Sequence, residues 1–185
     1  MINHIGNYSL LLCAVVSLII VFVISRKFKK KNFKISSNLL SFLSIQLLFS
    51  FISFFSLIYL FVTSDFSNET VYNNSHSTKP LFYKISGTWG NHEGSLLLWL
   101  LVLIIFGFLH TLFSKNMPIK QRFFTIVFQQ IIIFGFLTFT IFTSNPFDTI
   151  YPKPYDGLGL NPILQDPALA IHPPILYVGY VGTAI

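Results

Sequence analysis

Four apolar stretches of nearly uncharged residues constrain this chain more than any other feature. They cover residues 8–24, 39–62, 96–113 and 123–142, and a fifth apolar run opens at Ile175 and reaches Ile185. A helix needs about 20 residues to cross the hydrocarbon core of a bilayer. Only 10% of the residues are charged, against about 25% in a typical soluble domain. The sequence therefore predicts an all-α, polytopic transmembrane helix bundle, a single domain over residues 1–185.

The fifth run is too short to be a complete span. It holds about eleven residues, and a helix rises only about 1.5 Å per residue. We therefore expect an amino-terminal fragment of a larger protein, either a natural split subunit or a truncation. The first run ends in Arg26 and Lys27, whereas a cleavable signal peptide carries its positive charge ahead of the apolar part. Cys13, the single cysteine, lies within that run and is expected to be a buried apolar residue without a disulfide.

Basic and acidic residues are sorted between alternate loops. Nine of the 12 basic residues follow the first and third spans: Arg26, Lys27, Lys29, Lys30, Lys31, Lys34, Lys115, Lys120 and Arg122. All six acidic residues lie in the other loops: Asp65, Glu69, Glu93, Asp148, Asp156 and Asp166. Because short basic loops stay on the side of synthesis, we expect the amino terminus and the loops 64–95 and 143–174 on the outside. The net charge of +6 is then an orientation signal and does not indicate a nucleic-acid partner.

The spans themselves offer little chemistry. His110, near the inner end of the third span, is the exception, and we expect it to reach toward the membrane interface. Gly107 and Gly135 are expected to allow close helix packing. A solute pathway needs charged groups at membrane depth or broken helices, so this composition argues against a transporter. The segment 64–80 is predicted to be a polar surface loop.

Residues 87–95 place three glycines around Trp89 and His92, immediately before the third span. One interpretation is an anchor at the membrane interface, with Trp89 and Trp99 at headgroup level and Glu93 at the positive end of a helix. The density of glycines beside a histidine instead favours close approach of a flat or bulky partner. The residues alone leave both interpretations open.

His172 stands directly before two prolines, at the end of a loop that holds seven of the nine prolines of the chain. Pro173 biases His172 toward extended backbone, and Pro173 and Pro174 suit the first positions of a helix. The apolar neighbours Leu169 and Ile171 are expected to desolvate the imidazole and favour the neutral form, which binds metals. Local sequence is compatible with a structural histidine at a helix start and with a metal ligand.

Four longer motifs occur in the order of the predicted spans. They are Trp-Gly-Asn-His-Glu-Gly-Ser at 89–95, Ser-Asn-Pro-Phe at 144–147, Asp-Gly-x-x-Leu-Asn-Pro-Ile-Leu-Gln-Asp-Pro at 156–167 and His-Pro-Pro-Ile-Leu-Tyr-Val-Gly-Tyr-Val-Gly at 172–182. Together they resemble the amino-terminal part of the CcmF family, the integral membrane proteins of cytochrome c maturation that join haem to apocytochrome c. The resemblance covers the whole chain.

The resemblance implies a haem-binding subunit of a haem lyase, with His172 as an axial ligand of the iron of haem b and with no other metal. Trp89 and His92 are further candidate cofactor-binding residues. No catalytic residue is implied, because the reacting thiols belong to the apocytochrome. The implied partners are a haem chaperone of the CcmE type, apocytochrome c, a thiol-handling partner of the CcmH type and the remaining part of CcmF.

Two departures from the family pattern matter. Asn91 stands where the family more often has glycine, and the tryptophan-rich WWD segment and a second external histidine correspond to positions beyond Ile185. We therefore expect the chain to be inactive alone. The abundance of Phe, Ile, Lys and Asn suggests an AT-rich genome, as in split organelle-encoded members, so the expected location is the mitochondrial inner membrane, or otherwise the bacterial inner membrane. The alternatives are a scaffold subunit that docks the partners without binding haem and, with less support, a haem transporter.

Overall fold

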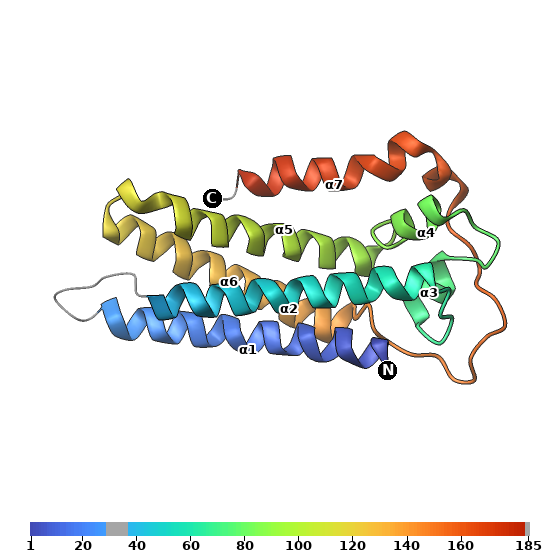
Figure 1. Cartoon of the computed structure of the whole chain (residues 1–185), viewed down its shortest axis with the longest axis horizontal. Helices are drawn as coiled ribbons and strands as arrows, with labels where there is room; N and C mark the ends of the chain where they lie inside the picture. Colours follow the sequence, from blue (N-terminus) through green and yellow to red (C-terminus); the bar gives the residue numbers. More distant parts are fainter. Residues whose placement is uncertain (29–36, 184–185) are drawn as a thin grey trace.

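Four long helices form the body of the protein, and the computed structural model describes residues 1–28 and 37–183. They are α1 (Ile2–Phe28), α2 (Ser37–Val62), α5 (His92–Phe113) and α6 (Ile119–Thr143), and they run alongside one another (Figure 1). Each is long and apolar enough to cross a membrane, and the described residues contain no strand. The predicted all-α bundle with four full spans is confirmed. Lys29, Lys30, Lys31, Lys34 and Ile185 lie outside the described residues.

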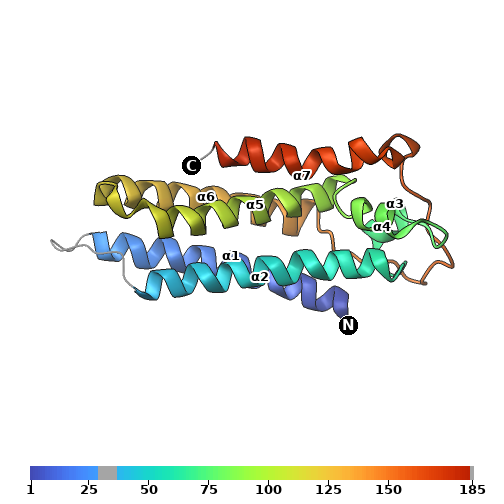
Figure 2. The same ribbon diagram turned by 45° about the horizontal axis from the view of Figure 1, so that its top comes forward.

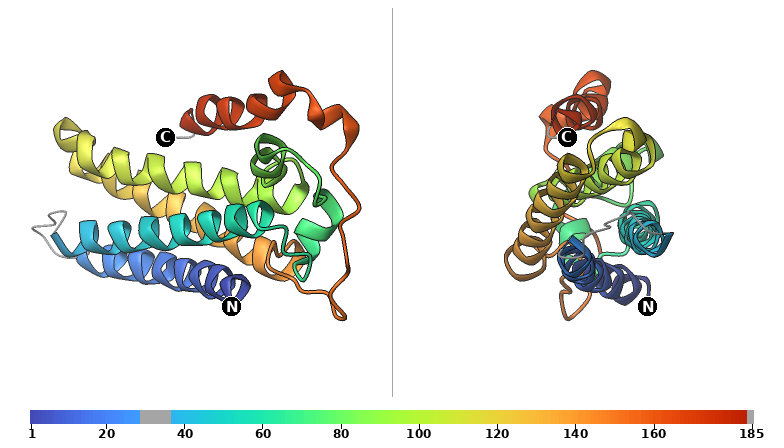
Figure 3. Two further views of the ribbon diagram at one scale, coloured as in Figure 1. Left: turned by 45° about the vertical axis from the view of Figure 1, so that its right-hand side comes forward. Right: turned by 90° about the vertical axis from the view of Figure 1, so that its left-hand side faces the viewer.

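The four helices form a closed ring. Helix α1 packs against α2 and α6, and α5 packs against the same two helices, as the end-on view in Figure 3 shows. Apolar side chains fill the ring in two clusters, one around Leu57, Leu100 and Leu137 and one around Ile20 and Ile126. Helices α2 and α6 therefore lie diagonally across the core.

The glycines of the spans differ in what they allow. A Cβ atom on Gly107 would lie 2.4 Å from the amide of Gln129 on α6, so Gly107 does permit close packing, as predicted. Around Gly135 there is nothing within 4 Å, and the same prediction is wrong there. The Nε2 atom of His110 is buried without a hydrogen-bond partner in the part of the chain that the structure describes. His110 lies in the last turn of α5, and its position at the membrane interface stays a prediction.

The acidic loops and the amino terminus gather at one end of the bundle, which we call the loop end (Figure 1). It carries α3 (Glu69–Asn74), α4 (Leu81–Gly87), residues 144–161 and η2 (Pro162–Gln165). The connection through η1 (Ser114–Asn116) lies at the opposite end with its basic residues. The two classes of loop are thus separated in space; which end faces outward stays a prediction.

Asn68 ties the loop end together and makes the segment 64–80 more than a plain surface loop. Its buried side chain caps α3 by accepting from the amide of Val71 at 2.9 Å. It also donates to the carbonyl of Pro146 and to the side chain of Asn3, both at 2.8 Å. Asn3 in turn donates to the carbonyl of Phe147 at 2.8 Å. The start of α1 and both acidic loops are therefore fastened at one point.

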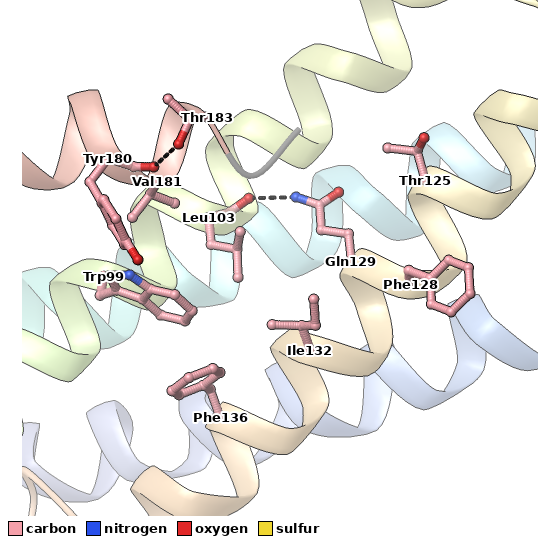
Figure 4. Close-up of a pocket in the computed structure, with 10 residues that line it drawn as sticks. All are labelled: Trp99, Leu103, Thr125, Phe128, Gln129, Ile132, Phe136, Tyr180, Val181 and Thr183. Atoms are coloured by element: carbon pink, nitrogen blue, oxygen red, sulfur yellow. Dashed lines mark hydrogen bonds between the residues drawn. The ribbon is translucent and has the colours of Figure 1, made fainter.

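Helix α7 (Pro167–Gly182) forms a separate layer on the outside of the ring, against α5 (Figure 2). Between α5, α6 and α7 lies a recess of about 560 Å³, where Trp99, Phe136 and Tyr180 come close to one another (Figure 4). The rings of Trp99 and Phe136 have centroids 4.3 Å apart. Much of α7 leaves its apolar side chains exposed, including Ile175 and Val178.

Candidate functional site

The three candidate binding residues from the sequence line one groove at the loop end. The groove has a volume of about 550 Å³ and lies between the start of α5 and the first half of α7. Its walls consist of Trp89, Gly90, Asn91, His92, Ser95, Leu164, His172, Pro173, Leu176 and Tyr177. Both histidines are exposed, and Trp89 is half-buried. The structure therefore brings His172 and His92 to the same cavity.

The turn before α5 is held by Asn91. Asn91 is the N-cap of α5: its side-chain oxygen accepts from the amide of Gly94 at 2.7 Å, and its Nδ2 donates to the carbonyl of Gly87 at 2.7 Å. The hydroxyl of Ser95 donates to the carbonyl of Trp89 at 2.8 Å. These bonds close the segment 87–95 onto itself and place His92 in the first turn of the helix.

His172 lies inside α7, so the extended backbone predicted for it is wrong. The helix begins at Pro167, whereas the sequence predicted that the fifth apolar run would begin only at Ile175. Asp166 is the N-cap, with its carboxylate accepting from the amides of Ala168 and Leu169 at 2.8 and 3.1 Å. A capping Asp followed by Pro is a strong helix start, and it prevails over the later Pro pair.

The surroundings of His172 also differ from the prediction. Its apolar neighbours Leu169 and Ile171 are exposed, as is His172 itself, so they do not desolvate the imidazole. The accessible ring can instead reach a large ligand seated in the groove.

Sequence reasoning missed Leu176 and Tyr177 as groove residues. They follow His172 by four and five positions, which places them on a neighbouring part of the helix surface once α7 is continuous. The sequence signal for these two groove residues was Asp166 followed by Pro167, because a helix that starts there includes His172 and fixes which residues share its face.

Trp89 joins the two walls of the groove. Its indole nitrogen donates a hydrogen bond of 2.8 Å to the backbone carbonyl of Ala170, in the first turn of α7. Ala170 is buried. This contact links the turn before α5 to the helix that carries His172.

Polar contacts fix the proline-rich loop that leads to α7. Lys153 pairs with Asp65 at 2.9 Å, and both oxygens of Asp156 accept from Ser77, at 2.9 and 2.5 Å. Burial alone would raise the pKa of the Asp65 carboxyl, but hydrogen bonds from Lys153 and Ser67 outweigh it and lower that pKa below its ordinary value. The loop therefore has a defined path across the loop end.

The donor set of the groove suits a haem better than a bare metal ion. Within residues 1–28 and 37–183, no group of three or more His, Cys, Asp or Glu side chains is placed to hold a metal ion. In a haem the porphyrin already supplies four ligands, so a single histidine can hold the iron. The aromatic and aliphatic walls at Trp89, Leu164 and Leu176 suit a flat, mostly apolar macrocycle. The residues present therefore fit this group.

The other candidates from the sequence lie away from the groove. Cys13 is fully buried, as predicted, and its thiol contacts the carbonyl of Gln46 at 3.6 Å. His4 stacks on Tyr8, and His76 pairs with Asp156 at 3.3 Å. His110 is near the opposite end of α5.

Fold and site together define a multi-pass membrane protein with a histidine-bearing aromatic groove at one end of a helix bundle. Residues 89–185, which begin at Trp89 and include both groove histidines, match the family described as "Cytochrome C assembly protein". The chain belongs to this family.

Bacterial relatives match the whole chain. It is 46% identical over 185 residues to the cytochrome c-type biogenesis protein CycK of Bradyrhizobium diazoefficiens, covering 100% of this chain and 28% of the relative. It is 42% identical over 193 residues to CcmF of Haemophilus influenzae, covering 100% of this chain and 29% of that protein. The predicted resemblance to CcmF is confirmed, and the chain spans less than a third of the length of these relatives.

A solved structure titled "Cytochrome c Heme Lyase CcmF" has the same fold over this region. The TM-score is 0.81 with 20% sequence identity, over 100% of this chain and 29% of the solved chain.

Proposed function

We propose that the chain acts in cytochrome c biogenesis as the amino-terminal, haem-binding part of a membrane haem lyase. The observation that carries this proposal is the groove in which Trp89, His92 and His172 meet. It lies within the family-matched segment 89–185. The names of the relatives, which are cytochrome c-type biogenesis proteins, supply the biological process.

His172 is the axial ligand of the haem iron in this proposal. Its place inside α7 limits the positions of the imidazole, while its exposure leaves the ring accessible. The apolar walls at Trp89 and Leu176 would exclude water from the face of the macrocycle, and His92 lines the same cavity from α5. A bound haem b supplies the iron and the vinyl groups to which the thiols of an apocytochrome add.

The proposal includes the setting of the chain. We infer that residues 1–185 form one transmembrane domain with the loop end outside, which is supported by the position of Arg26, Lys115, Lys120 and Arg122 at the opposite end. The membrane is the mitochondrial inner membrane, as the amino-acid composition suggests, or the bacterial inner membrane of the relatives. The partners are a CcmE-type haem chaperone, apocytochrome c, a CcmH-type thiol-handling protein and the remaining CcmF segments.

Replacing the proposed ligand tests this function. The chain carrying His172→Ala is produced together with the remaining CcmF segments, and the haem content of the purified complex and the yield of cytochrome c are measured. Loss of a group that only hydrogen-bonds a metal ligand lowers metal affinity or activity by about 10–100-fold. Loss of the ligand itself should therefore lower the retained haem by about tenfold or more. Cytochrome c yield should fall with it.

His4→Ala is the matched control, because His4 is also exposed at the loop end but lies outside the groove. It should leave haem content and cytochrome c yield unchanged. Unchanged haem in His172→Ala would overturn the ligand assignment. Unchanged haem with a lowered cytochrome c yield would instead support a scaffold subunit that docks the partners.

A further inference from the structure

We propose that Trp89 is a positioning residue for His172, and this inference rests on the proposed function. Its indole N–H replaces a helix hydrogen bond that Pro174 is unable to donate, and thereby fixes α7 against the turn before α5.

The missing bond follows from the sequence of α7. In an α-helix each carbonyl accepts from the amide four residues further on. The carbonyl of Ala170 would accept from residue 174, but Pro174 has no N–H group. Ala170 is only 4% exposed, and a buried carbonyl left without a donor is costly. The Trp89 indole supplies that donor at 2.8 Å.

The neighbouring carbonyl shows why only one replacement is needed. Pro173 removes the helix donor for the carbonyl of Leu169 in the same way. Leu169 is 42% exposed, so other hydrogen-bond donors can reach its carbonyl oxygen. Of the two carbonyls that the Pro pair releases, the one at the buried residue is the one that receives the indole.

Trp89 is also anchored on its other side. Its own carbonyl accepts from the hydroxyl of Ser95 at 2.8 Å, and Ser95 lies in the first turn of α5, next to His92. One residue therefore connects the helix turn that carries His92 to the helix that carries His172. Because Ala170 precedes His172 by two residues on α7, loss of the indole bond would release the imidazole from its place in the groove.

The Pro residue itself offers a rescue. Trp89→Phe keeps an aromatic ring but removes the N–H group, whereas Pro174→Ala restores the amide that the Ala170 carbonyl lacks. We therefore compare Trp89→Phe, Pro174→Ala and the double variant in the chain produced with the remaining CcmF segments. Trp99→Phe is the matched control, since Trp99 is the other tryptophan of the chain and its ring packs on Phe136.

The first measurement is amide hydrogen exchange of residues 166–180 in haem-free protein. An unsatisfied buried carbonyl favours opening of this segment by about tenfold, so exchange in Trp89→Phe should be about tenfold faster. The double variant should return to within about twofold of the wild type, and Pro174→Ala and Trp99→Phe should stay near it. Wild-type exchange in Trp89→Phe, or failure of Pro174→Ala to restore exchange or folding, would overturn the inference.

The second measurement is the visible spectrum and the reduction potential of bound haem, which report the iron ligand. Both should shift in Trp89→Phe and return in the double variant. The exchange result does not depend on haem, so the two proposals fail separately. Unchanged haem in His172→Ala overturns the ligand assignment but leaves the indole bond to Ala170 standing, whereas unchanged exchange in Trp89→Phe overturns the positioning role alone.

Discussion

Gly94 occupies a position that no side chain can share. A Cβ atom there would lie 1.6 Å from the carbonyl oxygen of Thr88, and Thr88 is fully buried. The obstacle is backbone, which is unable to rotate away as a side chain could. Gly94 is thus required for close approach of two backbone segments, and this approach closes the turn that carries Trp89 and His92.

Gly94→Ala should therefore destabilise the protein. Overpacking against fixed atoms costs about 1–3 kcal/mol, and we expect the upper end of that range because backbone must move. The thermal midpoint of the complex in detergent measures the effect. Gly135→Ala is the control: it has nothing within 4 Å and gains helix propensity worth up to about 1 kcal/mol. Equal changes in both variants would contradict the role of Gly94.

The two span glycines show what single residues in a sequence leave open. Gly107 and Gly135 have the same apolar surroundings in the sequence, yet only Gly107 faces a neighbouring helix. The apolar composition of a segment identifies it as a membrane span. Where all sides of the helix are apolar, however, composition does not indicate which side packs against another helix. The same limit hid Tyr177, whose place in the groove depends on the helical phase of α7.

At the scale of elements, the long helices were predictable and the short ones were not. Apolar runs of about 20 residues leave a membrane chain few alternatives to a helix. Helix α3 depends instead on Asn68, whose amide also bonds the distant Asn3 and Pro146. The Pro pair at 173–174 predicts a helix start at that point, but the cap that starts α7 is Asp166, six residues before His172.

The loop that leads to α7 should loosen in acid. Hydrogen bonds from Ser77 hold the pKa of Asp156 below its ordinary value of 3.8. A carboxyl with a lowered folded-state pKa contributes stability above its unfolded value and loses it as the pH falls through the folded value. We therefore expect amide exchange around Ser77 and Gly157, corrected for its intrinsic pH dependence, to rise only below pH 3.8.

Asp156→Asn should show the same loosening around Ser77 and Gly157 already at neutral pH, and the exchange of these amides should not change further in acid. Asp148→Asn is the control, because burial and the charge of Glu93 raise the pKa of Asp148, whereas the pKa of Asp156 is lowered. Removing that charge should not loosen the loop at neutral pH. A wild-type loop that exchanges at the same corrected rate on both sides of pH 3.8 would contradict the role of Asp156.

At the scale of the whole molecule, the groove arises from how the helices assemble. The segments 89–95 and 172–177 were each identified in the sequence, but their meeting requires α7 to pack on α5 outside the ring. That packing depends on contacts between distant residues, such as Trp89 with Ala170. The motifs therefore identified residues of the groove, while their mutual arrangement became visible only in the fold.

A polar pair crosses the core of the ring. Gln46 of α2 and Gln130 of α6 exchange two hydrogen bonds of 3.0 Å between their side-chain amides. Ser17 of α1 donates to the carbonyl and to the side-chain oxygen of Gln130, at 2.9 and 3.0 Å. All three residues are buried. Three of the four ring helices are thus joined where the bilayer offers no water as an alternative partner.

Breaking one side of this pair should harm the protein more than removing both. Gln130→Leu leaves the amide of Gln46, which is 0% exposed, without its partner, at a cost of about 1–3 kcal/mol. In Gln46→Leu with Gln130→Leu no amide is left unpaired, and much of that loss should be recovered. Thermal midpoints of the single and double variants in detergent, analysed as a double-mutant cycle, give the coupling energy. Hydrogen bonds between membrane helices contribute on average only about 0.6 kcal/mol, so a coupling near zero would show that apolar packing alone holds the ring together.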